Sequence, residues 1–129
     1  MSPAAHRRAH LHFDVLETRC LLALTLSEFP IPAPEYSVTG ITAGPDGKIW
    51  FTETNWNLFV GKIGVIDPST HAISEFSLPI HNAIAYGITA GPDGSLWFTE
   101  FVQGQNGYIG QIDPMRCRRQ CHTRTGIAF

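Results

Sequence analysis

An internal repeat constrains the fold of this 129-residue chain more than any other feature of its sequence. Residues 40–53 read GITAGPDGKIWFTE and residues 87–100 read GITAGPDGSLWFTE, so twelve of fourteen positions are identical at a spacing of 47. The similarity continues downstream, where residues 61–68 recur as residues 107–114. Near-identical successive units are typical of repeat architectures, in which each unit buries its apolar surface against the next one.

Each unit carries the signals of short strands joined by tight turns. The segment Gly44–Gly47 predicts a hairpin turn, because Pro45 fixes φ at about −65°, Asp46 accepts local hydrogen bonds and Gly47 tolerates a positive φ. No window shows helical periodicity over three turns, so we predict an all-β body. The strands of the first unit are expected at Ile41–Ala43, Lys48–Glu53, Gly61–Asp67 and Ala72–Leu78.

Four antiparallel strands in about 47 residues match the size of one β-propeller blade. The apolar run Ile49–Phe51 points to both sides of its strand, as expected when both faces of a sheet are covered. We therefore predict a partial propeller of about two blades within residues 24–114, with repeat units at about 40–78 and 87–114, preceded by an outer strand at Leu24–Phe29. Since propellers close with roughly four to eight blades, we expect a fragment of a ring or a unit that associates with itself through exposed blade faces.

The two ends of the chain differ from the repeat. Residues 1–23 are expected to form a leader or export segment, because Leu16–Ala23 resembles the Leu-Glu-x-Arg-x-Leu-Leu-Ala tag of some bacterial surface proteins. Because Glu17 interrupts the apolar region, the segment is a poor match to a conventional signal peptide. The expected location is outside the cell or at its surface, with the cytoplasm as the alternative. Residues 115–129 form an aberrant basic tail, which favours a disturbed reading frame or a truncated gene.

Charge and composition exclude two classes of partner. Residues 21–114 hold nine acidic residues against two lysines, which argues against nucleic-acid binding. No run of 18 apolar residues occurs, so no membrane span is predicted. The three cysteines, Cys20, Cys117 and Cys121, lie outside the repeat, so they predict no disulfide framework for it and do not define a redox compartment.

The repeated motifs together resemble those of the virginiamycin B lyase (streptogramin lyase) family. They are the Gly-Ile-Thr opening, the GPDG hairpin, the Trp-Phe-Thr-Glu strand, the Gly-x-Ile-Gly-x-Ile-Asp strand and the Ser-Glu-Phe-x-x-Pro outer strand, over about residues 25–114. The resemblance implies a seven-bladed propeller that linearises cyclic depsipeptide antibiotics of the streptogramin B type. It also implies metal-assisted elimination, in which a divalent ion, usually Mg²⁺, polarises the substrate, a Cα proton is removed and the ester C–O bond opens without water.

The resemblance also assigns positions for site residues. Catalytic histidines of the family precede the Gly-Ile or Ala-Ile that opens a blade, where this chain holds Thr39, Tyr86 and Thr125. Glu53 and Glu100 occupy the position of a metal-associated carboxylate. The chain thus keeps two candidate metal ligands and no catalytic residue, because the imidazoles whose pKa of about 6.5 suits proton transfer are missing. We expect the chain alone to be inactive.

Simpler interpretations exist for each of these groups. Glu53 and Glu100 recur in both units, as structural groups or solvated strand ends would. His71 and His81 fall in turns or connections and are expected at the surface. The aromatic residues of the repeat are expected to pack between blades and not to stack on a ligand; they are Trp50, Phe51, Trp97 and Phe98. Two further clusters lack the second half of a zinc site; they are His6, His10 and His12, and Cys117, Cys121 and His122.

Two other functions fit the same scaffold. The first is a non-catalytic extracytoplasmic propeller that binds a carbohydrate or a protein partner through its loops, as repeat scaffolds often do. The second, by resemblance to a related propeller, is a calcium-dependent lactonase-like hydrolase. Further blades that open with histidine would favour the lyase, whereas further blades without histidine would favour binding.

Overall fold

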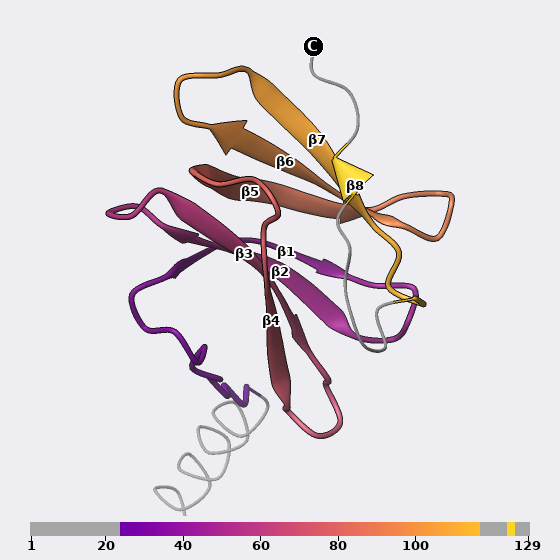
Figure 1. Ribbon diagram of the computed structural model, residues 1–129. Coiled ribbons are helices and arrows are strands. Elements are labelled where there is room, and N and C mark those ends of the chain that lie inside the picture. The colour runs from indigo at the N-terminus through magenta and orange to yellow at the C-terminus, as the bar shows by residue number, and fades with distance from the viewer. Residues whose placement is uncertain (1–23, 117–123, 126–129) are drawn as a thin grey trace, which may run out of the picture.

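The computed structural model describes residues 24–116 and 124–125, and these form two antiparallel four-stranded sheets without a helix (Figure 1). The first sheet consists of β1 (Ser37–Ala43), β2 (Ile49–Asn55), β3 (Val60–Ile66) and β4 (Ile73–Ser77). The second consists of β5 (Ala83–Ala90), β6 (Leu96–Val102), β7 (Gly107–Ile112) and β8 (Arg124–Thr125). Strand order follows chain order in both sheets. The predicted all-β fold with two four-stranded blades is confirmed.

The two GPDG turns have the conformation that their sequence predicts. Gly47 has a φ of 76° and Gly94 a φ of 77°, in the region that favours glycine. The carboxylate of Asp46 accepts hydrogen bonds from the backbone N–H of Lys48 at 3.2 Å and from the indole Nε1 of Trp50 at 3.1 Å. The turn therefore fixes both the start of β2 and the orientation of its first large aromatic side chain.

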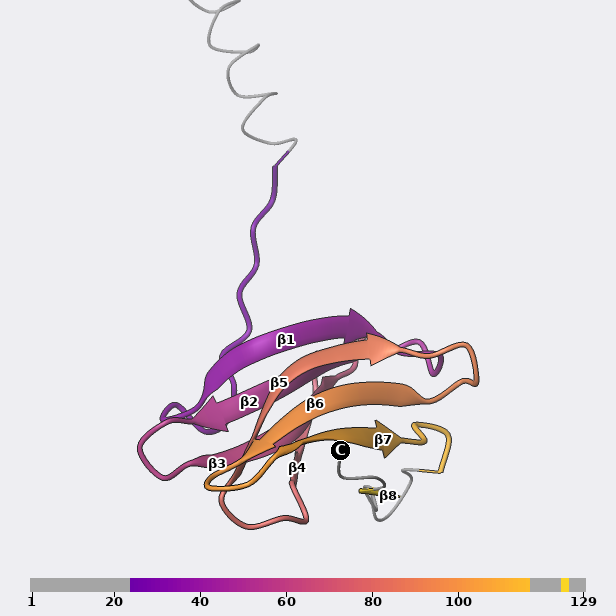
Figure 2. The same cartoon turned by 90° about the horizontal axis from the view of Figure 1, so that it is seen from above.

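The sheets pack face to face, and β5 forms most of the contact. In both views β5 lies between β1 and β6, so the inner strand of the second sheet is next to the first sheet (Figure 2). The core cluster draws on both sheets; it consists of Trp50, Ile63, Val65, Ala85, Leu96, Phe98 and Ile112. Each sheet thus buries part of its apolar surface only because the other one covers it.

Strand β2 is buried on both faces, as its apolar run predicts. Trp50 is 2% exposed and points toward the second sheet, whereas Phe51 is 5% exposed and points to the opposite side. The ring of Phe51 lies over Gly64 of β3, where an added Cβ would stand 2.2 Å from Cε2 of that ring. Phe98 lies over Gly110 in the same way, with a matching distance of 2.1 Å to Cζ. Glycine at these two positions makes room for the phenylalanine of each repeat.

The predicted outer strand at Leu24–Phe29 is wrong. Residues 24–30 form no strand, and the side chains of Leu24 and Leu26 are 83% and 82% exposed. An extended segment needs a neighbouring strand edge for its backbone hydrogen bonds, and no strand of the described part of the chain pairs with this one.

The fourth strand of the second sheet comes from a segment in which the repeat pattern is lost. Arg124 and Thr125 pair with Gln111 and Gly110 of β7. Thr125, expected to open a further blade, lies instead at the outer position of the second blade, because the free edge of β7 offers backbone groups that any extended segment can pair with. The predictions for residues 1–23 and for Cys117, Cys121 and His122 fall outside the described residues.

Candidate functional site

The positions that open each blade are β-bulges. The register of β1 against β2 shifts between Val38 and Gly40, so Thr39 has no partner in the ladder. The register of β5 against β6 shifts between Ala85 and Ile88, at the matching place in the repeat, and the shift contains Tyr86. Bulges release a residue from strand pairing and redirect its side chain. The position at which the resemblance predicts a histidine is therefore a β-bulge in both sheets.

At the first bulge, the side chain of Thr39 is used to join the two sheets. Its hydroxyl donates a hydrogen bond to the carbonyl oxygen of Ala85 at 2.9 Å, and the hydroxyl of Thr54 donates to the same oxygen at 2.8 Å. The hydroxyl of Thr52 donates to the carbonyl oxygen of Tyr86 at 2.7 Å. Three threonines of the first sheet thus hold the bulged backbone of β5, and we call them the threonine clasp.

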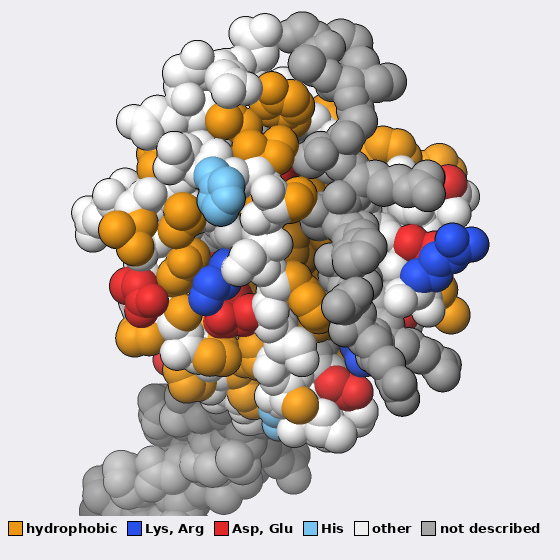
Figure 3. Space-filling view, viewed as in Figure 1, with side chains coloured by type: hydrophobic (Ala, Val, Ile, Leu, Met, Phe, Trp, Pro, Cys, Tyr) orange, Lys and Arg blue, Asp and Glu red, His pale blue; other side chains and the backbone are white. Residues whose placement is uncertain are grey.

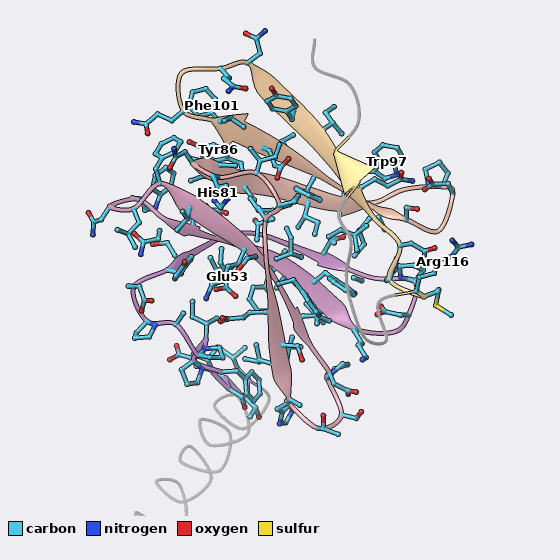
Figure 4. All side chains as sticks on the ribbon, viewed as in Figure 1. Glu53, His81, Tyr86, Trp97, Phe101 and Arg116 are labelled. Atoms are coloured by element: carbon cyan, nitrogen blue, oxygen red, sulfur yellow. The ribbon has the colours of Figure 1, made fainter. Side chains whose placement is uncertain are left out.

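At the second bulge, the side chain of Tyr86 faces outward and joins an exposed aromatic patch. Its ring centroid lies 5.7 Å from that of Trp56, and the rings of Phe59 and Phe101 meet edge to face at 5.9 Å. Trp56, Tyr86 and Phe101 are between 42% and 50% exposed. We call Trp56, Phe59, Tyr86 and Phe101 the aromatic patch. Figure 4 shows Tyr86, Phe101 and His81 toward the same end of the sheets, with Trp97 toward the other end.

The sequence alone did not reveal the aromatic patch. Trp56 stands in the short loop between β2 and β3, and a tryptophan flanked by Asn55 and Asn57 was the available signal. Figure 3 shows apolar side chains over both sheets on the face turned to the viewer, with charged groups scattered between them.

Glu53 is completely buried on the face of the first sheet that points away from the second. Among the described residues neither of its carboxylate oxygens has a hydrogen-bond partner. Burial is the main cause that raises its pKa to about 7; the negative charge of Glu75 also raises it, and Lys62 partly offsets both. Lys62 binds Glu75 at 2.9 Å and lies 4.3 Å from the centroid of the Tyr36 ring.

Glu100 occupies the same position in the second sheet but lies in a different environment. Its side chain is 3% exposed and points toward the first sheet, on the side of Phe98 and Leu96. Burial raises its pKa to about 7, and its oxygens lack hydrogen-bond partners among the described residues. The interpretation of Glu53 and Glu100 as solvated strand ends is therefore wrong.

The described residues do not by themselves fit a Mg²⁺ site. Mg²⁺ prefers six oxygen ligands in octahedral geometry and keeps several waters. Within residues 24–116 and 124–125, no group of three or more His, Cys, Asp or Glu side chains is placed to hold a metal ion. The carboxylate of Glu75, whose negative charge acts on Glu53, forms an ion pair with Lys62. That Glu53 and Glu100 bind a metal stays a prediction.

The remaining sequence expectations concern histidines and aromatic residues. His71 and His81 are exposed, as expected, and the ring of His71 lies 4.3 Å from that of Phe29. The aromatic residues of the repeat pack in the sheets, although Trp97 is only half-buried.

No helix in the described part of the chain is long and apolar enough to cross a membrane.

Two consecutive four-stranded sheets, repeated in sequence and packed through an inner strand, are neighbouring blades of a β-propeller. The chain belongs to the virginiamycin B lyase family, whose model matches residues 18–122.

Two solved structures are similar to the chain. One is the selenomethionine-substituted virginiamycin B lyase from Staphylococcus aureus, with 32% identity and a TM-score of 0.61 over 81% of this chain and 31% of that one. The other is a streptogramin B lyase structure, with 31% identity and a TM-score of 0.59 over 79% of this chain and 30% of that one. The chain thus spans about a third of their length. A comparison with curated proteins gave no match.

Proposed function

We propose that these blades are a ligand-binding segment of a propeller of the streptogramin B lyase type, and that the 129-residue chain does not open the ester by itself. The observation that carries the proposal is the occupancy of the two bulges by Thr39 and Tyr86. The Thr39 hydroxyl donates its proton to a backbone carbonyl, and the Tyr86 ring packs beside Trp56. Neither side chain offers the imidazole that would exchange a proton near neutral pH.

The two buried glutamates do not replace these groups. A carboxyl with a pKa of about 7 has the proton affinity that a general base needs. However, Glu53 and Glu100 are 0% and 3% exposed, so a substrate cannot approach either carboxyl unless the residues that cover it are displaced. A base must come within hydrogen-bond reach of the proton that it removes. Neither carboxyl meets this condition in the structure.

The aromatic patch supports the binding half of the proposal. Ligand sites are mostly apolar and aromatic, with few polar groups. Trp56 and Tyr86 present rigid, half-exposed rings, one of them from the bulge itself. A cyclic depsipeptide of the streptogramin B class would lay its apolar side chains on this surface. The patch equally favours a second candidate, a non-catalytic extracytoplasmic propeller that stacks a carbohydrate on these rings.

The test separates turnover from binding. The purified chain is incubated with a streptogramin B depsipeptide and Mg²⁺ and analysed by chromatography coupled to mass spectrometry. Elimination gives a linear isomer of unchanged mass, whereas hydrolysis adds one water. We expect neither product, together with quenching of tryptophan fluorescence that is lost in Trp56→Ala and kept in the matched variant Leu58→Ala. A linear isomer that disappears on chelation of the metal would contradict the proposal. An unquenched signal that responds to oligosaccharides would favour the second candidate.

A further inference from the structure

The outward face of the second sheet is the uncovered counterpart of a face that the first sheet buries. Trp97, Thr99 and Ile109 lie on this face, and we call them the trailing face. Their counterparts in the first sheet, which β5 and the rest of the second sheet cover, are Trp50, Thr52 and Ile63. The sequence thus provides the same contact surface twice, and the described structure covers it once.

Exposure shows the difference directly. Ile63 is 0% exposed, whereas Ile109 is 44% exposed at the matching position. Thr52 is also 0% exposed, but Thr99 lies open to solvent. Among the described residues, the Thr99 hydroxyl accepts a hydrogen bond from the Gly87 N–H at 3.0 Å and donates none.

The complementary surface exists on the opposite side of the first sheet. Val38 and Ile41 lie on the face of β1 that points away from the second sheet, and they are 51% and 69% exposed. We call them the leading face. Their counterparts in β5 are Ala85, which is 0% exposed, and Ile88, which packs against the core cluster. The leading face is therefore an open copy of the part that β5 contributes to the surface that the second sheet presents to the first. The counterparts of Phe98 and Glu100 in β2, Phe51 and Glu53, are already buried.

We propose that a second copy of this chain docks its leading face on the trailing face, and so repeats the internal contact between the sheets. Thr99 would then donate to the carbonyl of Thr39 in the next copy, as Thr52 does to the carbonyl of Tyr86 within one chain. A second copy fits better than an unrelated partner because both halves of the contact are already encoded in one chain, and the repeat supplies their geometry. Docking does not depend on ligand binding at the aromatic patch.

The contact is heterologous, since two different faces meet, and it therefore leads to a closed ring or an open chain of copies. Rings of roughly four to eight blades close, so two to four copies complete one. We expect a discrete assembly of two to four times the monomer mass of 14.2 kDa.

The test uses two charge substitutions at exposed positions of the full chain. Ile41→Lys blocks the leading face and Ile109→Lys blocks the trailing face, and each leaves the other face intact. Leu58→Lys, at a residue that is 67% exposed in the loop between β2 and β3, is the matched control. Sedimentation velocity measures the mass over a range of concentrations, and circular dichroism confirms the sheet content of each variant. Val38→Lys and Thr99→Lys replace any variant that loses its sheet signal.

The proposal requires five results together. The wild type and Leu58→Lys assemble, each blocked variant alone is a monomer, and an equimolar mixture of the two blocked variants forms a one-to-one dimer, because one intact leading face meets one intact trailing face. A monomeric wild type would overturn the proposal and leave the trailing face to another part of a longer chain. Assembly of either blocked variant alone, or a mixture that stays monomeric, would overturn it as well.

Discussion

Thr52 and Tyr86 are joined across the two sheets by a hydrogen bond of 2.7 Å from the threonine hydroxyl to the tyrosine carbonyl oxygen. The two residues are 34 positions apart in sequence, and Thr52 is completely buried. The bond satisfies a backbone group that the bulge in β5 removes from its own ladder. The contact between the blades therefore has a polar part, where threonine hydroxyls bind the backbone of β5, and an apolar part, which is the core cluster.

Loss of this hydroxyl should weaken the contact between the sheets. We expect Thr52→Val to lower the free energy of unfolding by about 1–2 kcal/mol, because the Tyr86 carbonyl stays buried without its donor. Thr99→Val is the matched control, since Thr99 holds the same place in the exposed face of the second sheet. Urea denaturation at dilute protein concentration measures both. If the two variants lose the same free energy of unfolding, the hydrogen bond from Thr52 to Tyr86 does not stabilise the contact between the sheets.

The buried glutamates should make stability depend on pH. Glu53 and Glu100 have pKa values of about 7 in the folded chain against the ordinary 4.5, so the folded state binds more protons than the unfolded state between these values. The stabilisation is complete below pH 4.5 and is lost as the pH rises through 7, on the order of 2 kcal/mol for each carboxyl. Chemical denaturation at pH 5 and pH 8 measures the loss.

A glutamine variant provides the control for this dependence. In Glu53→Gln/Glu100→Gln the decline between pH 5 and pH 8 should largely disappear, because the amides do not titrate. Asp67 and Asp93 have pKa values lowered by hydrogen bonds, Asp67 chiefly from Ser69 and Asp93 chiefly from Trp97. They contribute stability above their ordinary pKa of 3.8 that is lost as the pH falls further, outside this window. An undiminished decline in the double variant would contradict the assignment.

The glycines beneath the phenylalanine rings should not tolerate a side chain. Gly64→Ala places a Cβ 2.2 Å from Cε2 of Phe51, and we expect it to destabilise the fold by about 1–3 kcal/mol through overpacking. Gly87→Ala is the control, because its nearest neighbour would stand at 3.6 Å. Thermal unfolding followed by circular dichroism compares them. Adding Phe51→Leu should recover part of the loss in Gly64→Ala; without such recovery, the ring is not the obstacle.

Local signals in the sequence predicted the local structure well. The φ values of Gly47 and Gly94 follow from the residue types of the turn, and the burial of Trp50 and Phe51 follows from an apolar run that faces both ways. The outer strand at Leu24–Phe29 failed because a strand is a property of two paired segments, and the sequence of one segment does not show whether a partner edge is present.

The chemistry of the candidate site depended on contacts that local sequence does not show. The repeat placed Glu53 and Glu100 at equivalent positions, but different surroundings bury them. Glu100 faces the first sheet, whereas Glu53 lies on the face that points away from the second sheet, near Glu75 and Lys62. The threonine clasp joins Thr39 to Ala85, which lie 46 positions apart, and only the packing of the blades brings them together.

The bulge that opens each blade has an evolutionary consequence. Because its residue takes no part in strand pairing, a mutation there leaves the sheet ladder intact, and the two blades already differ at this point, with Thr39 in one and Tyr86 in the other. A propeller built from such units therefore has one position per blade whose residue can change while the strand pairing is kept. Substitution at each of these positions can introduce an acidic, a basic or an unreactive side chain independently, so related propellers can gain or lose reactivity while their fold stays the same.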